Sequence, residues 1–194
     1  MNKLLIVGTV AFDAIETPFG KIDKILGGSA PYIGLSASHF DVNSSIVSVV
    51  GSDFPKDILE AFEAQSIDTS AIEVIAGEKT FFWSGRYHEN MNSRDTIVTE
   101  LNVLSKFNPV IPTYFKDANV VVLGNLSPDS QKSVISQITN KKAFVILDTM
   151  NFWMDNALEG LLEVLKKVDV ISINEEEARQ LTSEKTLALA AKKI

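Results

Sequence analysis

Polar side chains follow two of the apolar runs of this sequence, at the points where strands are expected to end. Asp13 comes after the run Leu4–Val10, and Asn174 comes after Val168–Ile173. Ligands of open α/β sheets bind outside the carboxyl ends of the strands, so both residues are candidates for one binding edge. A carboxylate such as that of Asp13 can accept hydrogen bonds from two adjacent hydroxyl groups. The alternative for Asp13 is a solvated loop residue.

A pair of glycines, Gly27 and Gly28, stands before an expected helix in the segment KILGGSAPYIGLSAS. Glycine lets the backbone approach a ligand closely and change direction. Ser29 suits the N-cap of the helix, and Pro31 suits its first turn. The free amides at such a helix start can bind oxygen atoms of a ligand. An ordinary turn with a helix cap explains the same residues without a ligand.

The pair Asn174 and Glu177 opens a second expected helix, directly after an apolar run. Asn-x-x-Glu at a strand end can hold a hydrated Mg²⁺ near phosphates, because Mg²⁺ takes few protein oxygens and keeps several waters. The neighbouring acids Glu175 and Glu176 offer an alternative. All three carboxylates can simply favour the positive end of the helix dipole.

The composition is typical of an ordinary globular protein. Of the 194 residues, 45% are hydrophobic and 22% are charged, which suffices for one good-sized domain. The net charge of −7 argues against nucleic acid or an anionic membrane as the partner, since both need clustered Lys and Arg. The absence of cysteine excludes disulfides, cysteine-based zinc sites and thiol catalysis. We therefore expect a cytoplasmic protein.

The first residues, MNKLLIVGTVAFD, suit a buried strand better than a signal peptide, because charge follows the apolar run and no small-x-small cleavage site appears. No apolar run approaches the ~20 residues of a membrane span. The sequence also contains neither a G-x-x-x-x-G-K-[ST] phosphate loop nor a G-x-G-x-x-G fingerprint. The two histidines, His39 and His88, are too far apart for a local metal pair.

Short apolar runs rich in Val and Ile alternate with helix-like stretches along the chain. The predicted strands are Leu4–Val10, Ser45–Val50, Asn119–Leu123, Ala143–Leu147 and Val168–Ile173. The predicted helices are Tyr32–Phe40, Lys56–Gln65, Asp129–Ile138, Asn156–Leu165 and a last one from Thr186. Continuous apolar runs of this length are typical of strands buried on both faces. The alternation predicts an α/β fold, a doubly wound and mainly parallel sheet with helices on both faces.

One region departs from this alternation and predicts a small separate sheet. Thr80–His88 and Thr96–Leu104 read as a β-hairpin, and Ile15–Leu26 can add further strands. We expect these strands, within residues 14–26 and 79–104, to form a lid on a single domain of residues 1–194. A surface hairpin that only packs against the domain is the alternative.

Together, the quoted motifs resemble the ribokinase-like (PfkB) family of carbohydrate and nucleoside kinases. The shared features are Asp13, the Gly27-Gly28 helix start, the stretch SVVGSDFPKDILEAFEAQSIDTSAI and Asn174-x-x-Glu177, in matching order and spacing. The resemblance implies an ATP-dependent phosphotransferase whose acceptor is a hydroxyl group of a sugar or nucleoside. It covers roughly the first two-thirds of such an enzyme.

The resemblance also implies roles for individual residues. Asp13 would grip sugar hydroxyls, with Ser29 and Asn125 beside it, and Gly27 and Gly28 would be the hinge that closes the lid. Asn174 and Glu177 would organise Mg²⁺ through water near the triphosphate of ATP. The lid would often double as a contact between two copies of the chain, so a homodimer is expected.

Three departures from the family pattern limit these expectations. Tyr32 stands where the family often has Asn, and LDTMNFW replaces the commoner Asp-Pro-Asn at Asp148. The Gly-Ala-Gly-Asp signature, which supplies the anion hole and the catalytic base, does not occur in the sequence, and we expect it beyond Ile194. The 194 residues alone would then be an inactive kinase. The alternatives are a non-catalytic sugar- or nucleotide-binding protein of the same fold, and a flavodoxin-like binding domain, which leaves the hairpin unexplained.

Overall fold

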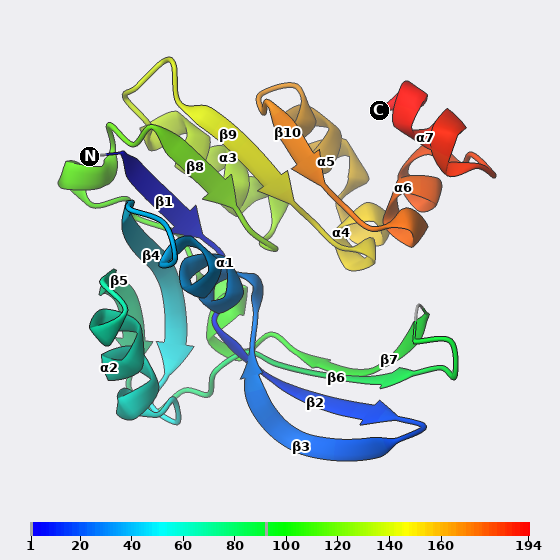
Figure 1. Cartoon of the computed structure of the whole chain (residues 1–194), viewed down its shortest axis with the longest axis horizontal. Coiled ribbons are helices and arrows are strands. Elements are labelled where there is room, and N and C mark those ends of the chain that lie inside the picture. The colour runs from blue at the N-terminus through cyan, green and yellow to red at the C-terminus, as the bar shows by residue number, and fades with distance from the viewer. Residues whose placement is uncertain (1, 92) are drawn as a thin grey trace.

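The computed structural model of the protein describes residues 2–91 and 93–194. Its larger sheet has six strands in the order β10-β9-β8-β1-β4-β5, and every neighbouring pair is parallel (Figure 1). Their bounds are β1 Lys3–Val7, β4 Asn43–Gly51, β5 Ile67–Ile75, β8 Val120–Leu123, β9 Phe144–Asp148 and β10 Val170–Ser172. The strand order changes direction between β1 and β8, and the carboxyl end of the central strand β1 therefore lies at a switch point, where open sheets bind ligands.

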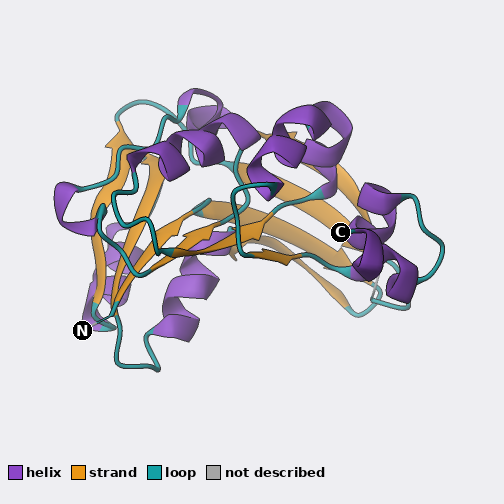
Figure 2. Cartoon of the chain, turned by 90° about the horizontal axis from the view of Figure 1, so that it is seen from above, coloured by secondary structure: helices purple, strands orange, loops and turns teal. Residues whose placement is uncertain are grey.

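Helices cover both sides of this sheet, as the view from above shows (Figure 2). Their bounds are α1 Ser29–Ala37, α2 Lys56–Ala64, α3 Pro128–Gln137, α4 Asn151–Asn156, α5 Leu158–Leu165, α6 Glu175–Thr182 and α7 Leu187–Lys193. Two short 3₁₀ helices span Asn102–Lys106 and Thr113–Phe115. The predicted fold class, a doubly wound parallel sheet with helices on both faces and a small β lid, is confirmed.

The apolar runs explain why the sheet is buried. Leu5, Ile6 and Val7 of β1 are fully buried, and they contribute to both hydrophobic clusters, one on each face. In a strand, successive side chains point to opposite faces, so a continuous apolar run is what a strand covered on both sides requires. The burial of these side chains fixes the depth and register of β1.

The lid is a second, four-stranded sheet in the order β3-β2-β6-β7. Its strands are β2 Ala11–Thr17, β3 Gly20–Gly27, β6 Phe82–Tyr87 and β7 Arg94–Glu100. The pairs β2–β3 and β6–β7 are antiparallel, whereas β2 and β6 run parallel. Figure 1 shows this sheet projecting from the larger one, and β1 leads directly into β2. A space is thus framed between the lid and the carboxyl ends of the central strands.

Several predicted element bounds are wrong. The strand β5 was not predicted, because its alternation of buried and exposed residues is interrupted by Asp, Ser and Glu. The stretch Asn156–Leu165 is only partly one helix, since α4 ends at Asn156 and α5 begins at Leu158. The predicted strand Thr96–Leu104 ends at Glu100 and continues into a 3₁₀ helix.

The last helix, α7, packs against α6. The side chain of Ala190 in α7 is fully buried, and Lys193 donates a hydrogen bond to the carbonyl of Thr182. Within residues 2–91 and 93–194, no helix has both the length and the apolar character to cross a membrane.

Candidate active site

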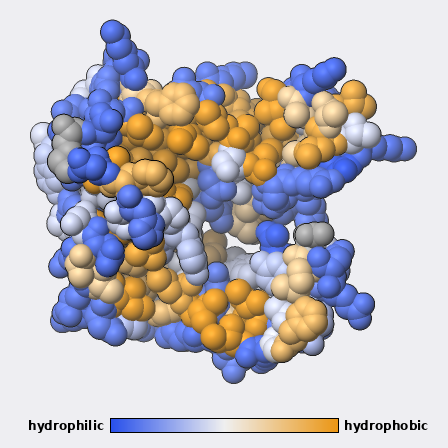
Figure 3. Space-filling model, viewed as in Figure 1, coloured by the Kyte–Doolittle hydropathy of each residue, from blue (hydrophilic) through white to orange (hydrophobic). Residues whose placement is uncertain are grey.

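A cleft of about 370 Å³ lies between the lid and the carboxyl ends of the sheet strands. The space-filling view shows it as the hollow in the middle of the molecule (Figure 3). The residues that line it are Thr9, Asp13, Gly28, Ser29, Tyr32, Phe81, Trp83, Tyr87, Arg94, Asn125, Asp148, Thr149, Met150 and Glu177. Five residues singled out from the sequence, Asp13, Gly28, Ser29, Asn125 and Glu177, thus share one cavity.

Asp13 is a half-buried carboxylate on β2 that makes no hydrogen bond or ion pair with the described residues. Burial without a compensating partner raises the pKa of Asp13 to about 6. Leaving a carboxylate unpaired inside a protein is costly, so its position calls for a partner from outside the chain. Hydroxyl groups of a ligand in the cleft would supply that partner.

Gly27 is needed because its neighbour is this carboxylate. A Cβ atom at Gly27 would collide with the Cγ, Oδ1 and Oδ2 atoms of Asp13, whose partner on β3 is Ile25, two residues before Gly27. Gly27 itself lies outside the lining of the cleft. Its lack of a side chain therefore makes the room in which the Asp13 carboxylate stands.

Gly28 is the N-cap of α1, and this corrects the expectation that Ser29 caps the helix. The φ of Gly28 is 87°, a left-handed conformation that other residues rarely adopt, and a Cβ there would collide with the carbonyl of Thr9. No side chain caps this helix start, and Ser29 is its first helical residue. The backbone thus turns sharply where the lid strand β3 joins the core.

The hydroxyl of Ser29 links two strand ends instead of capping the helix. It accepts a hydrogen bond of 3.2 Å from the amide of Asn125, and the amide of Ser29 donates to the hydroxyl of Thr9 at 3.1 Å. Gly8 and Gly124 make room for it, because a Cβ at either position would press on the Ser29 oxygen. Ser29 therefore holds α1 against the ends of β1 and β8.

The side chain of Asn125 faces the cleft but is already partnered. Its amide nitrogen lies 2.9 Å from the sulfur of Met150, and its oxygen accepts a 2.8 Å hydrogen bond from the indole of Trp153. These contacts fix the orientation of the Asn125 amide. They leave the second lone pair of its oxygen for a ligand.

Asn174 and Glu177 form a capping box at the start of α6. The amide of Glu177 donates to the Asn174 side-chain oxygen, the amide of Asn174 donates to Glu177 Oε2, and both distances are 2.9 Å. Asn174 is exposed and outside the cleft lining, whereas Glu177 is buried, and burial raises the pKa of Glu177. The structure thus gives these two residues a capping role at the start of α6, which was not predicted from the sequence.

The described residues are not arranged to bind a metal ion directly. Among the residues that the structure describes, no three His, Asp or Glu side chains are grouped so that they could hold a metal ion. Glu177 Oε2 is committed to the capping box, so one oxygen of this residue, Oε1, is left for the cleft. The residues fit a hydrated Mg²⁺ that is contacted through water, and they do not fit a dehydrated one.

Sequence reasoning gave no site role to Asp148, the last residue of β9. Burial, with a smaller contribution from the charge of Glu177, raises the pKa of Asp148 to about 6. Asp148 follows an apolar run just as Asp13 does, and that signal could have identified it. Its neighbours Thr149 and Met150 also line the cleft.

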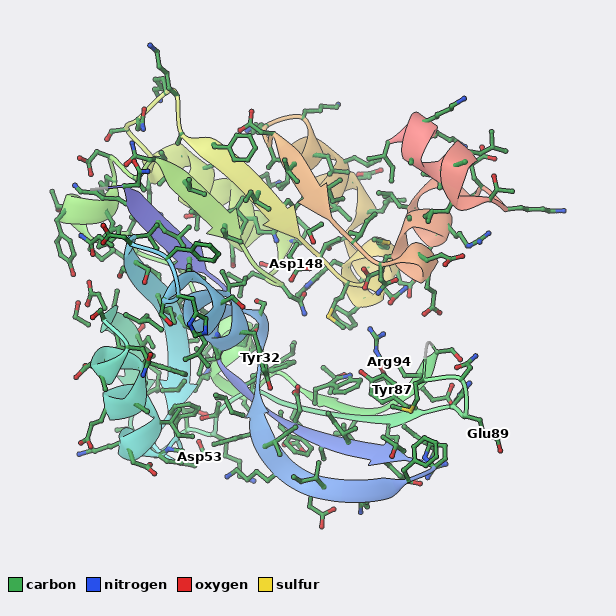
Figure 4. All side chains as sticks on the ribbon, in the orientation of Figure 1. Tyr32, Asp53, Tyr87, Glu89, Arg94 and Asp148 are labelled. Atoms are coloured by element: carbon green, nitrogen blue, oxygen red, sulfur yellow. The ribbon has the colours of Figure 1, made fainter. Side chains whose placement is uncertain are left out.

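The lid wall of the cleft was not predictable residue by residue. Trp83 and Tyr87 of β6 face the cleft, and the indole of Trp83 lies where a side chain at Gly85 would be. Arg94 at the start of β7 lies with its guanidinium carbon 6.0 Å from the Trp83 ring centre. In Figure 4 the Arg94 side chain points from the lid toward the core, where Asp148 lies. The opening thus has an aromatic wall opposite a polar one.

A larger cavity of about 700 Å³ lies elsewhere, between β10, α5 and the C-terminal helices. Most of its lining is apolar, including Leu162, Leu165, Ile171 and Leu181. None of the candidate residues borders this cavity. The chemistry-bearing side chains gather instead in the smaller cleft.

Comparisons with known proteins agree with this geometry. The model of the pfkB family of carbohydrate kinases matches residues 1–194. The cytidine kinase of Thermococcus kodakarensis is 28% identical over 196 residues, which cover 99% of this chain and 68% of that protein. The match extends over the lid as well as the core.

Two solved structures are similar in fold. The adenosine kinase from Sinorhizobium meliloti has a TM-score of 0.77 at 14% identity, covering 97% of this chain and 70% of that one. The ribokinase from Cryptococcus neoformans var. grubii in complex with ADP has a TM-score of 0.75 at 13% identity, covering 99% and 65%. The chain thus spans about two thirds of the length of these relatives. Because the family model matches the chain from end to end, the protein belongs to the pfkB family of carbohydrate kinases.

Proposed function

We propose that the protein transfers the γ-phosphoryl group of ATP to a hydroxyl group of a nucleoside or sugar. The observation that carries this proposal is Asp13, a carboxylate that is held without a partner in a cleft beneath a lid. A charge-assisted hydrogen bond to a substrate hydroxyl would supply the missing interaction. Family membership supports the reaction class, and the complex of a similar ribokinase with ADP supports ATP as the donor.

A nucleoside fits the two walls of the cleft better than a free sugar does. Trp83 and Tyr87 offer aromatic faces on the lid, suited to a planar base, whereas Asp13 and Asn125 offer acceptors suited to ribose hydroxyls. The cytidine kinase and the adenosine kinase among the similar proteins support the same preference. A volume of about 370 Å³ is within the usual range for small-molecule sites.

In the reaction, the acceptor oxygen attacks the γ-phosphorus, the bond from that phosphorus to the bridging oxygen breaks, and ADP leaves. Asp13 and Asn125 bind and orient the acceptor. The hydroxyl proton passes to a base, and the resemblance assigns that base to the Gly-Ala-Gly-Asp signature, which the 194 residues do not contain. We propose that these residues supply the acceptor half of the site and do not transfer phosphate alone.

Mg²⁺ would be held through water by Glu177 Oε1, with the carboxylate of Asp148 nearby. Burial, with a smaller contribution from the charge of Glu177, raises the pKa of Asp148, and a cation in the cleft would favour the ionised form of both carboxyl groups. When bound, Mg²⁺ neutralises the charge of the phosphate oxygens. Asn174 contributes by fixing Glu177 through the capping box rather than by binding the ion.

Closure of the lid would exclude water, which otherwise competes with the acceptor for the phosphoryl group. Gly28 is the residue best suited to act as the hinge. It lies between β3 and α1 in a left-handed conformation that glycine adopts readily. The side chains of Trp83 and Tyr87 would then pack against the bound nucleoside.

The test is a panel of nucleosides and sugars, with binding measured by calorimetry and transfer measured by ADP release from ATP. We expect binding of a nucleoside by the 194-residue chain, and substrate-dependent ADP release only by protein that carries the Gly-Ala-Gly-Asp signature. Binding of none of the panel would refute the proposal. Binding without ADP release by a protein that has this signature would instead identify a non-catalytic binding protein.

We also propose that two copies associate through the lid in the cytoplasm. The lid leaves several large apolar side chains exposed: Phe19, Ile22, Ile97 and Val98. Such side chains are expected at a surface that another chain covers. Light scattering of the wild type and of Ile97→Lys would test this, and a wild-type monomer would contradict it.

A further inference from the structure

Four charged side chains line the described part of the cleft, of which three are acidic and one is basic. Asp13 on β2, Asp148 on β9 and Glu177 on α6 carry carboxyl groups, whereas Arg94 on β7 is the one cationic residue in the described part of the lining. The three acids come from three separate elements of the core and lid. Asp148 and Glu177 therefore lie on the side of the core, whereas Asp13 and Arg94 lie on strands of the lid sheet.

The backbone of Asp148 is held in place by a buried side chain. The carbonyl of Asp148 accepts a 3.1 Å bond from the side chain of Gln131, which is fully buried and also binds the carbonyl of Gly124 at 2.9 Å. Gln131 thus ties the ends of β8 and β9 together, and the Asp148 carboxylate is presented on a fixed backbone.

Such a fixed carboxylate accepts hydrogen bonds from hydroxyl groups and repels anions. Like charges close together in a partly enclosed site repel each other strongly, so a phosphate group beside Asp148 meets substantial repulsion. Arg94 faces the same space from the lid and attracts anions. Asp148 and Arg94 therefore act in opposite directions on a ligand that already carries phosphate.

We propose that Asp148 is a specificity-determining residue of the acceptor site, which binds an uncharged nucleoside or sugar through its hydroxyl groups and excludes acceptors that already carry a phosphate. The proposal rests on the proposed function, because it concerns the acceptor of that reaction. It goes beyond that function by excluding nucleoside monophosphates and sugar phosphates as acceptors. The same repulsion would act on the phosphorylated product and promote its release.

The experiment measures a ratio, the dissociation constant of a nucleoside 5′-monophosphate divided by that of the same nucleoside, in the absence of ATP. We expect the wild type to bind the monophosphate at least about 30-fold more weakly. Asp148→Asn keeps the size of the side chain and removes the charge, so the ratio should fall by about 5- to 50-fold, even though the nucleoside itself binds less tightly.

Arg94→Gln is the opposing variant. It removes the cation that attracts phosphate, and the ratio should therefore rise above that of the wild type. Asp155→Asn is the matched control, since Asp155 is exposed on the neighbouring α4 and contacts Gln180 outside the cleft lining. It removes the same unit of charge from the protein, and we expect the wild-type ratio. Thermal unfolding of each variant checks that it is folded.

The outcomes separate this inference from the proposed function. A wild type that binds neither nucleosides nor sugars contradicts the proposed function itself. A wild type that binds nucleoside and monophosphate equally well contradicts only the exclusion. If Asp148→Asn leaves the ratio unchanged, or Asp155→Asn lowers it as much, the selectivity does not reside in Asp148 and the inference is overturned.

Discussion

The carboxylates of Asp13 and Glu177 line the same cleft, yet their surroundings are opposite. Glu177 is buried at the start of α6, where its carboxylate accepts a 2.9 Å hydrogen bond from the amide of Asn174 within a complete capping box. Asp13 has no such bond to any described residue, and burial alone raises the pKa of its carboxyl to about 6. One acid completes a local structure, and the other does not.

The contrast shows which of the two acids needs a ligand to explain its buried position. The capping box accounts for Glu177 without any ligand, because it satisfies two otherwise free amides of the helix start. No described residue explains why the Asp13 carboxylate is partly buried. The absence of a side chain at Gly27 leaves the space that this carboxylate occupies. The chain therefore sacrifices stability at Asp13, as is common at binding sites.

The largest effect is expected from Asp13→Asn. Loss of a charge-assisted hydrogen bond worth ~1.5–3 kcal/mol should weaken nucleoside binding by roughly ten- to a hundredfold. Asp53→Asn is the control, since Asp53 has partners in the amide and hydroxyl of Thr80 and lies away from the cleft (Figure 4). It should lower thermal stability and leave affinity alone. Calorimetry that finds equal affinity for wild type and Asp13→Asn would remove Asp13 from the site.

The next effect concerns the room made for that carboxylate. Gly27→Ala places a methyl group against Asp13 without changing any charge, so the carboxylate must move and affinity should fall by about tenfold. Gly20→Ala is the matched control, because a Cβ at Gly20 meets nothing within 4 Å on the same lid strand. If both variants bind nucleoside equally well in calorimetry, the close approach of Gly27 has no role in binding.

The same contrast explains what the sequence could predict. The α/β class, the lid and the clustering of Asp13, Gly28, Ser29 and Asn125 follow from apolar runs and strand ends, which are local signals. The use of Gly27 as space for Asp13 is a contact between paired strands, and no local pattern encodes it.

Other site features depended on tertiary structure in the same way. Arg94 reaches the cleft only because β6 and β7 pair and the lid faces the core, so the sequence offered no signal for it. Asp148 could have been identified from its place at the end of a strand. It was given no role because LDTMNFW differs from the commoner Asp-Pro-Asn of the family. Ser29 was misassigned because Gly28 provides the turn without a side-chain cap.

A smaller effect is expected in the pH dependence of stability. The pKa of Asp13 is about 6 in the folded protein and near 3.8 when unfolded, so the folded state holds the proton more tightly. Its contribution to stability is complete below pH 4 and is lost as the pH rises to about 6. Asp13→Asn should therefore be more stable than the wild type at pH 8, by about 1 kcal/mol after solvent screening, and equal to it at pH 4. Urea unfolding at both pH values measures this, and a variant less stable at pH 8 would contradict it.

Substitutions at the capping box should affect helix stability and Mg²⁺ dependence, and they should leave nucleoside binding unchanged. Asn174→Ala should lower the free energy of unfolding by ~0.5–2 kcal/mol, as the loss of a helix cap does. Glu177→Gln should change stability by less, since Gln also completes a capping box, but it should raise the Mg²⁺ concentration for half-maximal ADP release. Glu176→Gln, exposed on the same turn, is the control. Identical Mg²⁺ titrations of wild type, Glu177→Gln and Glu176→Gln would leave Glu177 with its capping role alone.

The most direct test of the account is the pKa of the Asp13 carboxyl, measured by carbon NMR with and without a bound nucleoside. We predict a value of about 6 in the free protein, because burial disfavours the charge. Nucleoside hydroxyls that donate to the carboxylate favour its charged form, so the value should fall toward the ordinary range on binding. An ordinary value near 3.8 in the free protein, or a raised value that saturating nucleoside leaves unchanged, would contradict the claim that Asp13 is held unpartnered for a ligand.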